Sequence, residues 1–138
     1  MKIQDIMSTK VESILPTATL RRAAQKMDQL DIGALPIISG EGTLLGIITD
    51  RDISCFAVAM GHEPNSTEVQ KVMTKEVFTC FEDQDISDAA SLMEDKHIRR
   101  LTVLNHDNSV VGLLSVDDLA HGSHDLAGAV LEAATPIH

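Results

Sequence analysis

The chain repeats itself, and this internal repeat limits the possible folds more than any other feature. The stretch "GIITDRD", Gly46 to Asp52, returns as "GLLSVDD", Gly112 to Asp118. The same offset carries Met7 onto Met73 and holds without a gap over about fifty positions. A repeat of this length marks two copies of one supersecondary unit. We therefore predict two small units that share a core within 138 residues.

Each copy predicts the element order β-α-β-β-α. "VESI" and "VFTC" alternate as short strands, and an apolar stripe at helical spacing follows each, with Thr19 and Asp85 placed as N-caps. The pairs "ALPIIS" with "LLGIIT" and "RLTVLN" with "VVGLLS" predict hairpins. A second helix starts at Asp50 in one copy and near Val116 in the other. The fold class is α/β (α+β), with two tandem repeats packed about a pseudo-twofold axis, because one copy alone leaves a sheet face bare.

These elements divide the chain into a first repeat at 1–60, a linker at 61–69, a second repeat at 70–121 and a C-terminal helical tail at 122–138. Gly61 is expected to end a helix, and Pro64 prevents its continuation. The tail carries one apolar helical face, formed by Leu126, Ala127, Val130, Leu131 and Ala134. That face either packs on its own module or contacts a dimer mate or partner.

Composition argues against several classes of partner. The net charge is −10, and the chain has three Phe with no Trp or Tyr, so we expect no nucleic-acid binding. No apolar run reaches the roughly 20 residues of a membrane span, which predicts no membrane association. The N-terminus lacks the apolar core of a signal peptide, so the expected location is cytoplasmic.

Reactive side chains are few and poorly grouped. Cys55 and Cys80 are expected to be reduced, partly buried thiols. His121 and His124 share a helical spacing but lack a third ligand, and Gly122-Ser123 between them suggests a helix break followed by a cap. We therefore predict no metal site and no cofactor. Neither a Ser-His-Asp order nor a glycine-rich phosphate loop is visible, so we predict that the protein is not an enzyme.

The repeated motifs resemble a known family. Two tandem units, each with a "DIGALPII" or "HIRRLTVL" strand and a "GIITDRD" or "GLLSVDD" turn, are similar to cystathionine β-synthase (CBS) domains paired in a Bateman module. The resemblance spans about residues 1 to 121 and implies a stand-alone regulatory sensor. The implied ligand is AMP, ADP, ATP or S-adenosylmethionine, bound in a cleft between the repeats. CBS modules commonly dimerise, so the resemblance also implies a homodimer that signals to an unknown target protein.

The resemblance also implies which residues bind the ligand. In the family, the Thr or Ser that ends the strand contacts phosphate or ribose, and the Asp three residues later holds the ribose hydroxyls. These positions are Thr49 and Asp52 in the first copy and Ser115 and Asp118 in the second. A carboxylate that accepts from two hydroxyls makes charge-assisted hydrogen bonds. The same residues also suit simple helix capping, and both interpretations remain open at this stage.

Adenine needs an aliphatic slot beside these polar groups. The residues expected to line it are Val11, Ile14, Leu35 and Pro36, with Val77, Cys80, Leu101 and Thr102 opposite.

The two copies differ in their basic residues. The second copy has Arg99 and Arg100 before its strand, where family members commonly place a phosphate-binding cation, and the first copy instead offers Arg51. Pro36 matches the family pattern and Thr102 departs from it. We expect one competent site and one weak or empty site, without ranking them. The alternative is a scaffold or interaction protein whose clefts bind no nucleotide.

Overall fold

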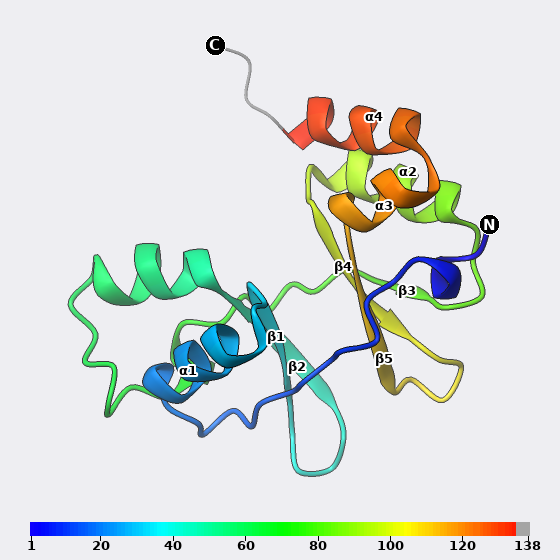
Figure 1. Ribbon diagram of the computed structural model, residues 1–138. Helices are drawn as coiled ribbons and strands as arrows, with labels where there is room; N and C mark the ends of the chain where they lie inside the picture. Colours follow the sequence, from blue (N-terminus) through cyan, green and yellow to red (C-terminus); the bar gives the residue numbers. More distant parts are fainter. Residues whose placement is uncertain (135–138) are drawn as a thin grey trace. The chain divides into compact units, whose positions relative to one another are not determined.

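In the computed structural model, which describes residues 1–134, the first copy forms the expected helix and hairpin (Figure 1). The helix α1 (Leu20–Leu30) begins where the Thr19 hydroxyl accepts a 3.2 Å hydrogen bond from the Arg22 N–H. Strand β1 (Ala34–Ile38) pairs antiparallel with β2 (Leu44–Thr49). The buried face of α1 packs with these strands into one apolar core.

The second copy builds a three-stranded sheet and three helices. Its sheet order is β3-β4-β5, with β3 parallel to β4 and β4 antiparallel to β5. Figure 1 shows the three helices grouped together, and their apolar residues share one core with the sheet. The elements are β3 (Thr79–Phe81), α2 (Ile86–Lys96), β4 (Arg100–Leu104), β5 (Val110–Ser115), α3 (Val116–Gly122) and α4 (His124–Ala134).

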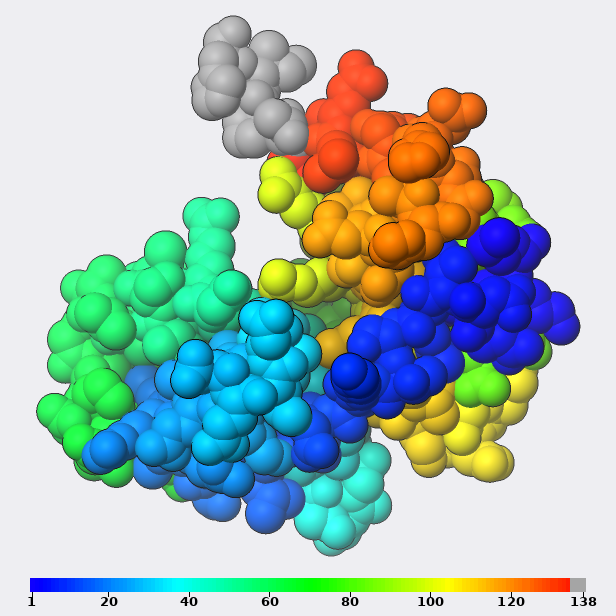
Figure 2. All heavy atoms as spheres, in the orientation of Figure 1, coloured from blue at the N-terminus to red at the C-terminus, as the bar shows by residue number. Residues whose placement is uncertain are grey.

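The chain exchanges short segments between its two copies. One compact unit, here called the first-copy unit, is Glu12–Val77, and the second-copy unit joins Met1–Val11 to the chain from Phe78 onward. The division predicted from the repeat instead gave Met1–Val11 to the first copy. Figure 2 shows the dark-blue N-terminal residues against the yellow and orange residues of their unit. The N-terminal segment of the chain therefore completes the second copy.

Backbone pairing explains this exchange. The Ser8 N–H donates to the Leu113 carbonyl at 2.9 Å, and the Leu113 N–H donates back to Ser8 at 3.0 Å, which adds an edge to β5. Thr74, the residue equivalent to Ser8 in the other copy, pairs in the same way with Ile47 of β2 at 2.9 and 3.0 Å. Each copy's leading segment thus extends the sheet of the other copy.

The glycine of each repeated turn makes room for the exchanged segment. A Cβ atom on Gly46 would lie 2.7 Å from the Thr74 carbonyl oxygen, and one on Gly112 would lie 2.9 Å from the Ser8 carbonyl oxygen. Ordinary contacts of a Cβ atom begin at about 3.4 Å. Only glycine therefore lets the two backbones approach this closely.

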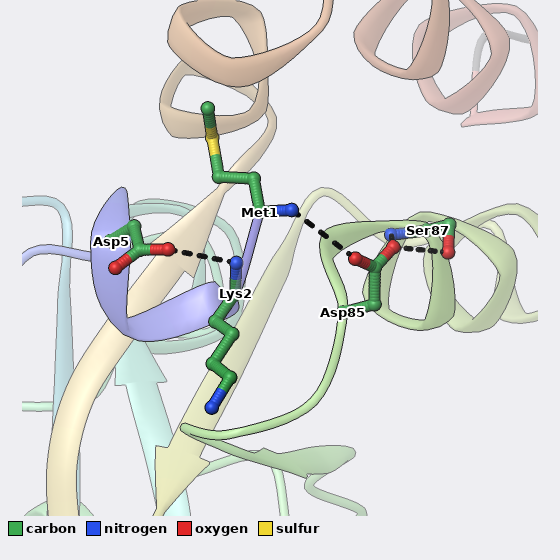
Figure 3. Close-up of polar contacts among 5 residues, drawn as sticks. All are labelled: Met1, Lys2, Asp5, Asp85 and Ser87. Carbon is green, nitrogen blue, oxygen red and sulfur yellow. Dashed lines mark hydrogen bonds and ion pairs between the residues drawn. The ribbon is translucent and has the colours of Figure 1, made fainter.

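The N-terminus is fixed to the second-copy unit by polar contacts (Figure 3). The Met1 ammonium lies 3.4 Å from Asp85 Oδ1, and the same carboxylate caps α2 by accepting from the Ser87 N–H at 3.0 Å. The Lys2 N–H donates to Asp5 at 2.9 Å at the start of the short 3₁₀ helix η1 (Ile3–Asp5). Asp85 therefore acts as the N-cap that the sequence predicts, and it also holds the chain terminus.

Two elements differ from the sequence-based expectation. "VESI" is not a strand, because only Ile14 pairs there, in a single bridge to Ile37. The second helix of the first copy is a π-helix, η2 (Asp52–Val58), and no periodicity argument anticipates that geometry. The predicted linker, 61–69, ends where a 3₁₀ turn, η3 (Val69–Lys71), begins, and Val69 is fully buried.

The tail packs on its own unit, as one of its two interpretations predicts. The helix α3 ends at Gly122, and the Ser123 hydroxyl caps α4 by accepting from the Leu126 N–H at 3.3 Å, as the break-and-cap reading requires. Ala127 and Val130 are buried in the core of the second-copy unit. The remainder of the predicted tail, 135–138, lies outside the described residues. Among residues 1–134, none of the helices has both the length and the apolar character needed to cross a bilayer.

Candidate functional site

The four predicted polar residues form two reciprocal helix caps. In the first copy, the Thr49 N–H donates to Asp52 Oδ2 at 3.0 Å, and the Asp52 N–H donates to Thr49 Oγ1 at 3.1 Å. In the second copy, the corresponding distances between Ser115 and Asp118 are 2.9 and 3.1 Å. The Ser115–Asp118 pair is a capping box at the start of α3, and the Thr49–Asp52 pair makes the same two bonds across the turn that leads into η2. Each pair therefore has a structural role whatever else it binds.

The two carboxylates differ in what remains available to a ligand. Asp52 is 4% exposed, and the Thr74 hydroxyl lies 3.3 Å from both of its oxygens. Asp118 is only half-buried, and its Oδ1 has no hydrogen-bond partner within residues 1–134. The Thr74 hydroxyl therefore engages the first carboxylate through one shared proton, whereas the second carboxylate keeps an oxygen without a partner within residues 1–134. Sequence reasoning missed Thr74, and the repeat held no signal for it, because the equivalent Ser8 does not bond Asp118 within residues 1–134.

The basic residues are exposed in both copies. Arg51 precedes Asp52 at the start of η2, and Arg99 and Arg100 lie at the start of β4. Arg100 is directly opposite Ser115 in the β4–β5 register, so the two side chains share one face of the sheet. Within residues 1–134, none of the three guanidinium groups makes a hydrogen bond or ion pair. Arg100 is thus the unpaired cation best placed beside the second capping box.

Thr102 carries a hydroxyl that the described protein does not satisfy. It lies in the middle of β4, is 1% exposed, and its Oγ1 is buried without a partner among residues 1–134. Leaving a buried polar group unpaired costs about 1–3 kcal/mol, and native proteins rarely do so without a reason. The first copy places Pro36 at the equivalent position, so the fold itself does not require a hydroxyl there.

Half of the predicted adenine slot is core instead. Leu35 is fully buried in the first-copy core, and Leu101 in the second-copy core. Because side chains alternate along a strand, Pro36 points away from the first-copy core and Thr102 points away from the second-copy core. Ile14 and Cys80 are also packed in these cores, whereas Val11 and Val77 are half-buried at the ends of their segments. Core packing therefore removes Leu35, Leu101, Ile14 and Cys80 from the slot. The candidates that remain are Pro36, Thr102, Val11 and Val77.

The first-copy unit has a shallow pocket of about 440 Å³ beside η2. Phe56 and Met60, which line it, are 52% and 71% exposed, so it is an open apolar hollow. Its residues are Asp52, Phe56, Met60, His62, Lys71, Val72, Met73 and Thr74. The pocket offers little polar recognition from Asp52, because that carboxylate is buried and bonded to Thr49 and Thr74.

Within residues 1–134, the cysteines and histidines are not gathered into a reactive centre. Burial raises the pKa of the Cys80 thiol to about 12, while Cys55 is exposed. Within the described part of the chain, no group of three or more His, Cys, Asp or Glu side chains is arranged to hold a metal ion.

Comparison with known proteins places these features in a family context. The CBS domain model matches residues 3–57 and 69–125. The CBS domain-containing protein YhcV of Bacillus subtilis is 35% identical over 131 residues, which cover 94% of this chain and 91% of YhcV. The crystal structure of the CBS domain protein TA0289 from Thermoplasma acidophilum superposes with a TM-score of 0.86 over 96% of this chain and 75% of that one, at 21% identity.

A further solved structure holds ligands. The CBS domain pair of protein MJ0100, crystallised with 5'-methylthioadenosine and S-adenosyl-L-methionine, is 28% identical to this chain. Its TM-score is 0.78, over 88% of this chain and 94% of that one. The comparisons therefore match both repeats of this sequence to the same domain.

Proposed function

We propose, from the premise that the chain belongs to the CBS-domain family, that it is a non-catalytic regulatory module which binds an adenosyl ligand. Ligand binding would shift a population of conformations that a partner protein or a second copy reads. The observation that carries the proposal is the Asp118 carboxylate, which keeps a free oxygen beside a helix cap. The MJ0100 pair, with its two adenosyl ligands, supports the choice of ligand class.

The second copy supplies the groups that such a ligand requires. Asp118 Oδ1 would accept from the vicinal hydroxyls of the ribose in charge-assisted hydrogen bonds. Arg100 lies on the same sheet face as Ser115, and its guanidinium would pair with a phosphate or carboxylate of the ligand. Arg99 is exposed at the same strand start and adds positive charge. In a chain of net charge −10, an anionic ligand needs local cations of this kind.

The first copy is the weaker binder in this proposal. Thr74 and the Thr49 N–H already take up the Asp52 carboxylate, which is almost fully buried. A ligand would have to displace the Thr74 hydroxyl before Asp52 accepted its ribose. Arg51 is the exposed cation there, but the carboxylate beside it is already bonded to Thr49 and Thr74.

The test is isothermal titration of the full chain with AMP, ADP, ATP and S-adenosylmethionine in turn. For a ligand that binds, Asp118→Ala should weaken affinity at least tenfold, because charge-assisted hydrogen bonds contribute about 1.5–3 kcal/mol. The matched control is Asp117→Ala, which removes an exposed carboxylate from the neighbouring position and should change affinity little. Equal affinity in Asp118→Ala and the wild type would contradict the assigned site.

The second candidate function is a scaffold or interaction protein without a nucleotide ligand. The bonds from Thr49 and Thr74 to Asp52 favour it, because that buried carboxylate already has structural partners. If Asp118 were purely structural as well, neither copy would bind an adenosyl compound. The same titration separates the two functions, since the scaffold gives no heat and no thermal stabilisation with any of the four compounds.

A further inference from the structure

The unpaired Thr102 hydroxyl lies on the same sheet face as the ligand-binding groups proposed above. Leu101 and Val103, its neighbours in β4, are both buried in the second-copy core. Strand alternation therefore directs Thr102 and Arg100 to the other face of the sheet. Ser115 is opposite Arg100 in the ladder, so a cation and two hydroxyl-bearing residues share this face.

The spacing of these groups suits a ligand with separate anionic and neutral polar ends. Arg100 and Thr102 are two residues apart, which is about 7 Å along a strand. The Arg100 side chain is exposed and unpaired within residues 1–134, and the Thr102 hydroxyl is buried. An exposed cation receives a charged group, whereas a buried hydroxyl discriminates by hydrogen bonding, because a ligand without a matching group leaves it unsatisfied.

The first copy lacks this combination. Pro36 occupies the position of Thr102 and has neither a hydroxyl nor an N–H, and Ala34 occupies the position of Arg100. In addition, the nearby Asp52 carboxylate is bonded to Thr74. The unsatisfied hydroxyl is thus a feature of the second copy alone.

We infer that Thr102 is a specificity-determining residue of the second copy, whose hydroxyl makes a hydrogen bond with a polar group of the bound adenosyl ligand. This inference rests on the proposed function. The hydroxyl is unpaired while the site is free of ligand and becomes paired when the ligand enters. Binding would therefore remove an unfavourable feature of the unliganded protein. The hydroxyl adds to the preference for the second copy that the free Asp118 oxygen already gives.

Thr102→Val tests the inference, because valine keeps the shape and removes the hydroxyl. Without ligand, this variant should raise Tm by about 4 °C, since an unsatisfied group is lost. The affinity for whichever of AMP, ATP and S-adenosylmethionine binds the wild type should fall about five- to tenfold. Thr102→Ser keeps the hydroxyl and should hold affinity within about twofold of the wild type.

The matched stability control is Thr74→Val, the same change at a hydroxyl that has a partner. It should lower Tm, because it leaves Asp52 without one of its donors. If Thr102→Val also lowers Tm, the hydroxyl is already paired without ligand and the inference is wrong. A higher Tm with unchanged ligand affinity overturns the inference and leaves the proposed function standing. No binding of AMP, ADP, ATP or S-adenosylmethionine to the wild type overturns both.

Discussion

Replacing Gly46 with alanine should detach the exchanged segment from β2. The new Cβ atom would lie 2.7 Å from the Thr74 carbonyl oxygen, which is 0.7 Å less than the 3.4 Å where ordinary contact begins. A retreat of that size would stretch the two Ile47–Thr74 hydrogen bonds, now 2.9 and 3.0 Å, beyond about 3.6 Å, where they no longer count as bonds.

The expected loss follows from these distances. Two backbone hydrogen bonds contribute about 0.5–1.5 kcal/mol each, and overpacking of a tight contact costs about 1–3 kcal/mol. Because relief of the clash is what breaks the bonds, the two effects overlap, and we expect a destabilisation of about 2–3 kcal/mol. For a chain of this length, that corresponds to a fall in Tm of about 10 °C.

The assay is thermal unfolding followed by circular dichroism, with two companion variants. Gly112→Ala should behave like Gly46→Ala, because its Cβ atom would lie 2.9 Å from the Ser8 carbonyl oxygen. Gly128→Ala is the control: among residues 1–134, no atom beyond its own stretch of helix lies within 4 Å of its Cβ position, and alanine favours the helix α4, so Tm should rise slightly. Wild-type stability in both Gly46→Ala and Gly112→Ala would refute the segment exchange.

Three further predictions concern single side chains. Asp31 ends α1 in the left-handed region at φ 53°, so Asp31→Gly should stabilise the protein by about 0.5–1 kcal/mol in denaturant unfolding; a loss would show that the aspartate side chain contributes there. Burial raises the pKa of Cys80 to about 12, so a thiol reagent at pH 8 should modify Cys55 quickly and Cys80 only on unfolding, and two fast thiols would contradict this. The hydrogen bond from His106 lowers the pKa of Asp83, so its stabilising effect should be present above the carboxyl's unfolded pKa and be lost as pH falls through the lower folded value; His106→Ala should raise that pKa in an NMR titration, and an unchanged value would exclude the contact.

Much of the fold was predictable because its signals are local. The caps at Thr19 and Asp85 were predictable because short polar side chains precede apolar stripes at helical spacing. Both hairpins followed from branched apolar runs on either side of a turn. The break at Gly122-Ser123 was predictable because glycine often ends a helix and serine often begins the next one.

The segment exchange was not predictable, because a repeat shows which segments are equivalent and not which copy each one packs against. Ser8 and Thr74 align, and either could have paired with β2 or with β5. The decision depends on contacts between residues far apart in the chain, such as Ser8 with Leu113. The strand predicted at "VESI" does not form for a related reason. Its residues alternate as in a strand, but they do not lie beside a partner strand over enough positions to pair.

The candidate site was predictable in its polar residues and not in their availability. The spacing of Ser115 and Asp118 predicted a shared cap, which is present in both copies. Only the three-dimensional contacts distinguish Asp52, held by Thr74, from Asp118, which keeps a free oxygen. The unpaired hydroxyl of Thr102 is likewise a property of its surroundings and not of its residue type.

The most direct test of the central claim is calorimetric titration of the wild-type chain with AMP, ATP and S-adenosylmethionine, read for stoichiometry. Because both oxygens of Asp52 have a partner and Asp118 Oδ1 has none within residues 1–134, we expect saturable binding of one of these compounds at one high-affinity site per chain. Two equal sites would contradict the ranking of the copies. No heat and no thermal stabilisation with any of the three compounds would contradict the sensor function itself.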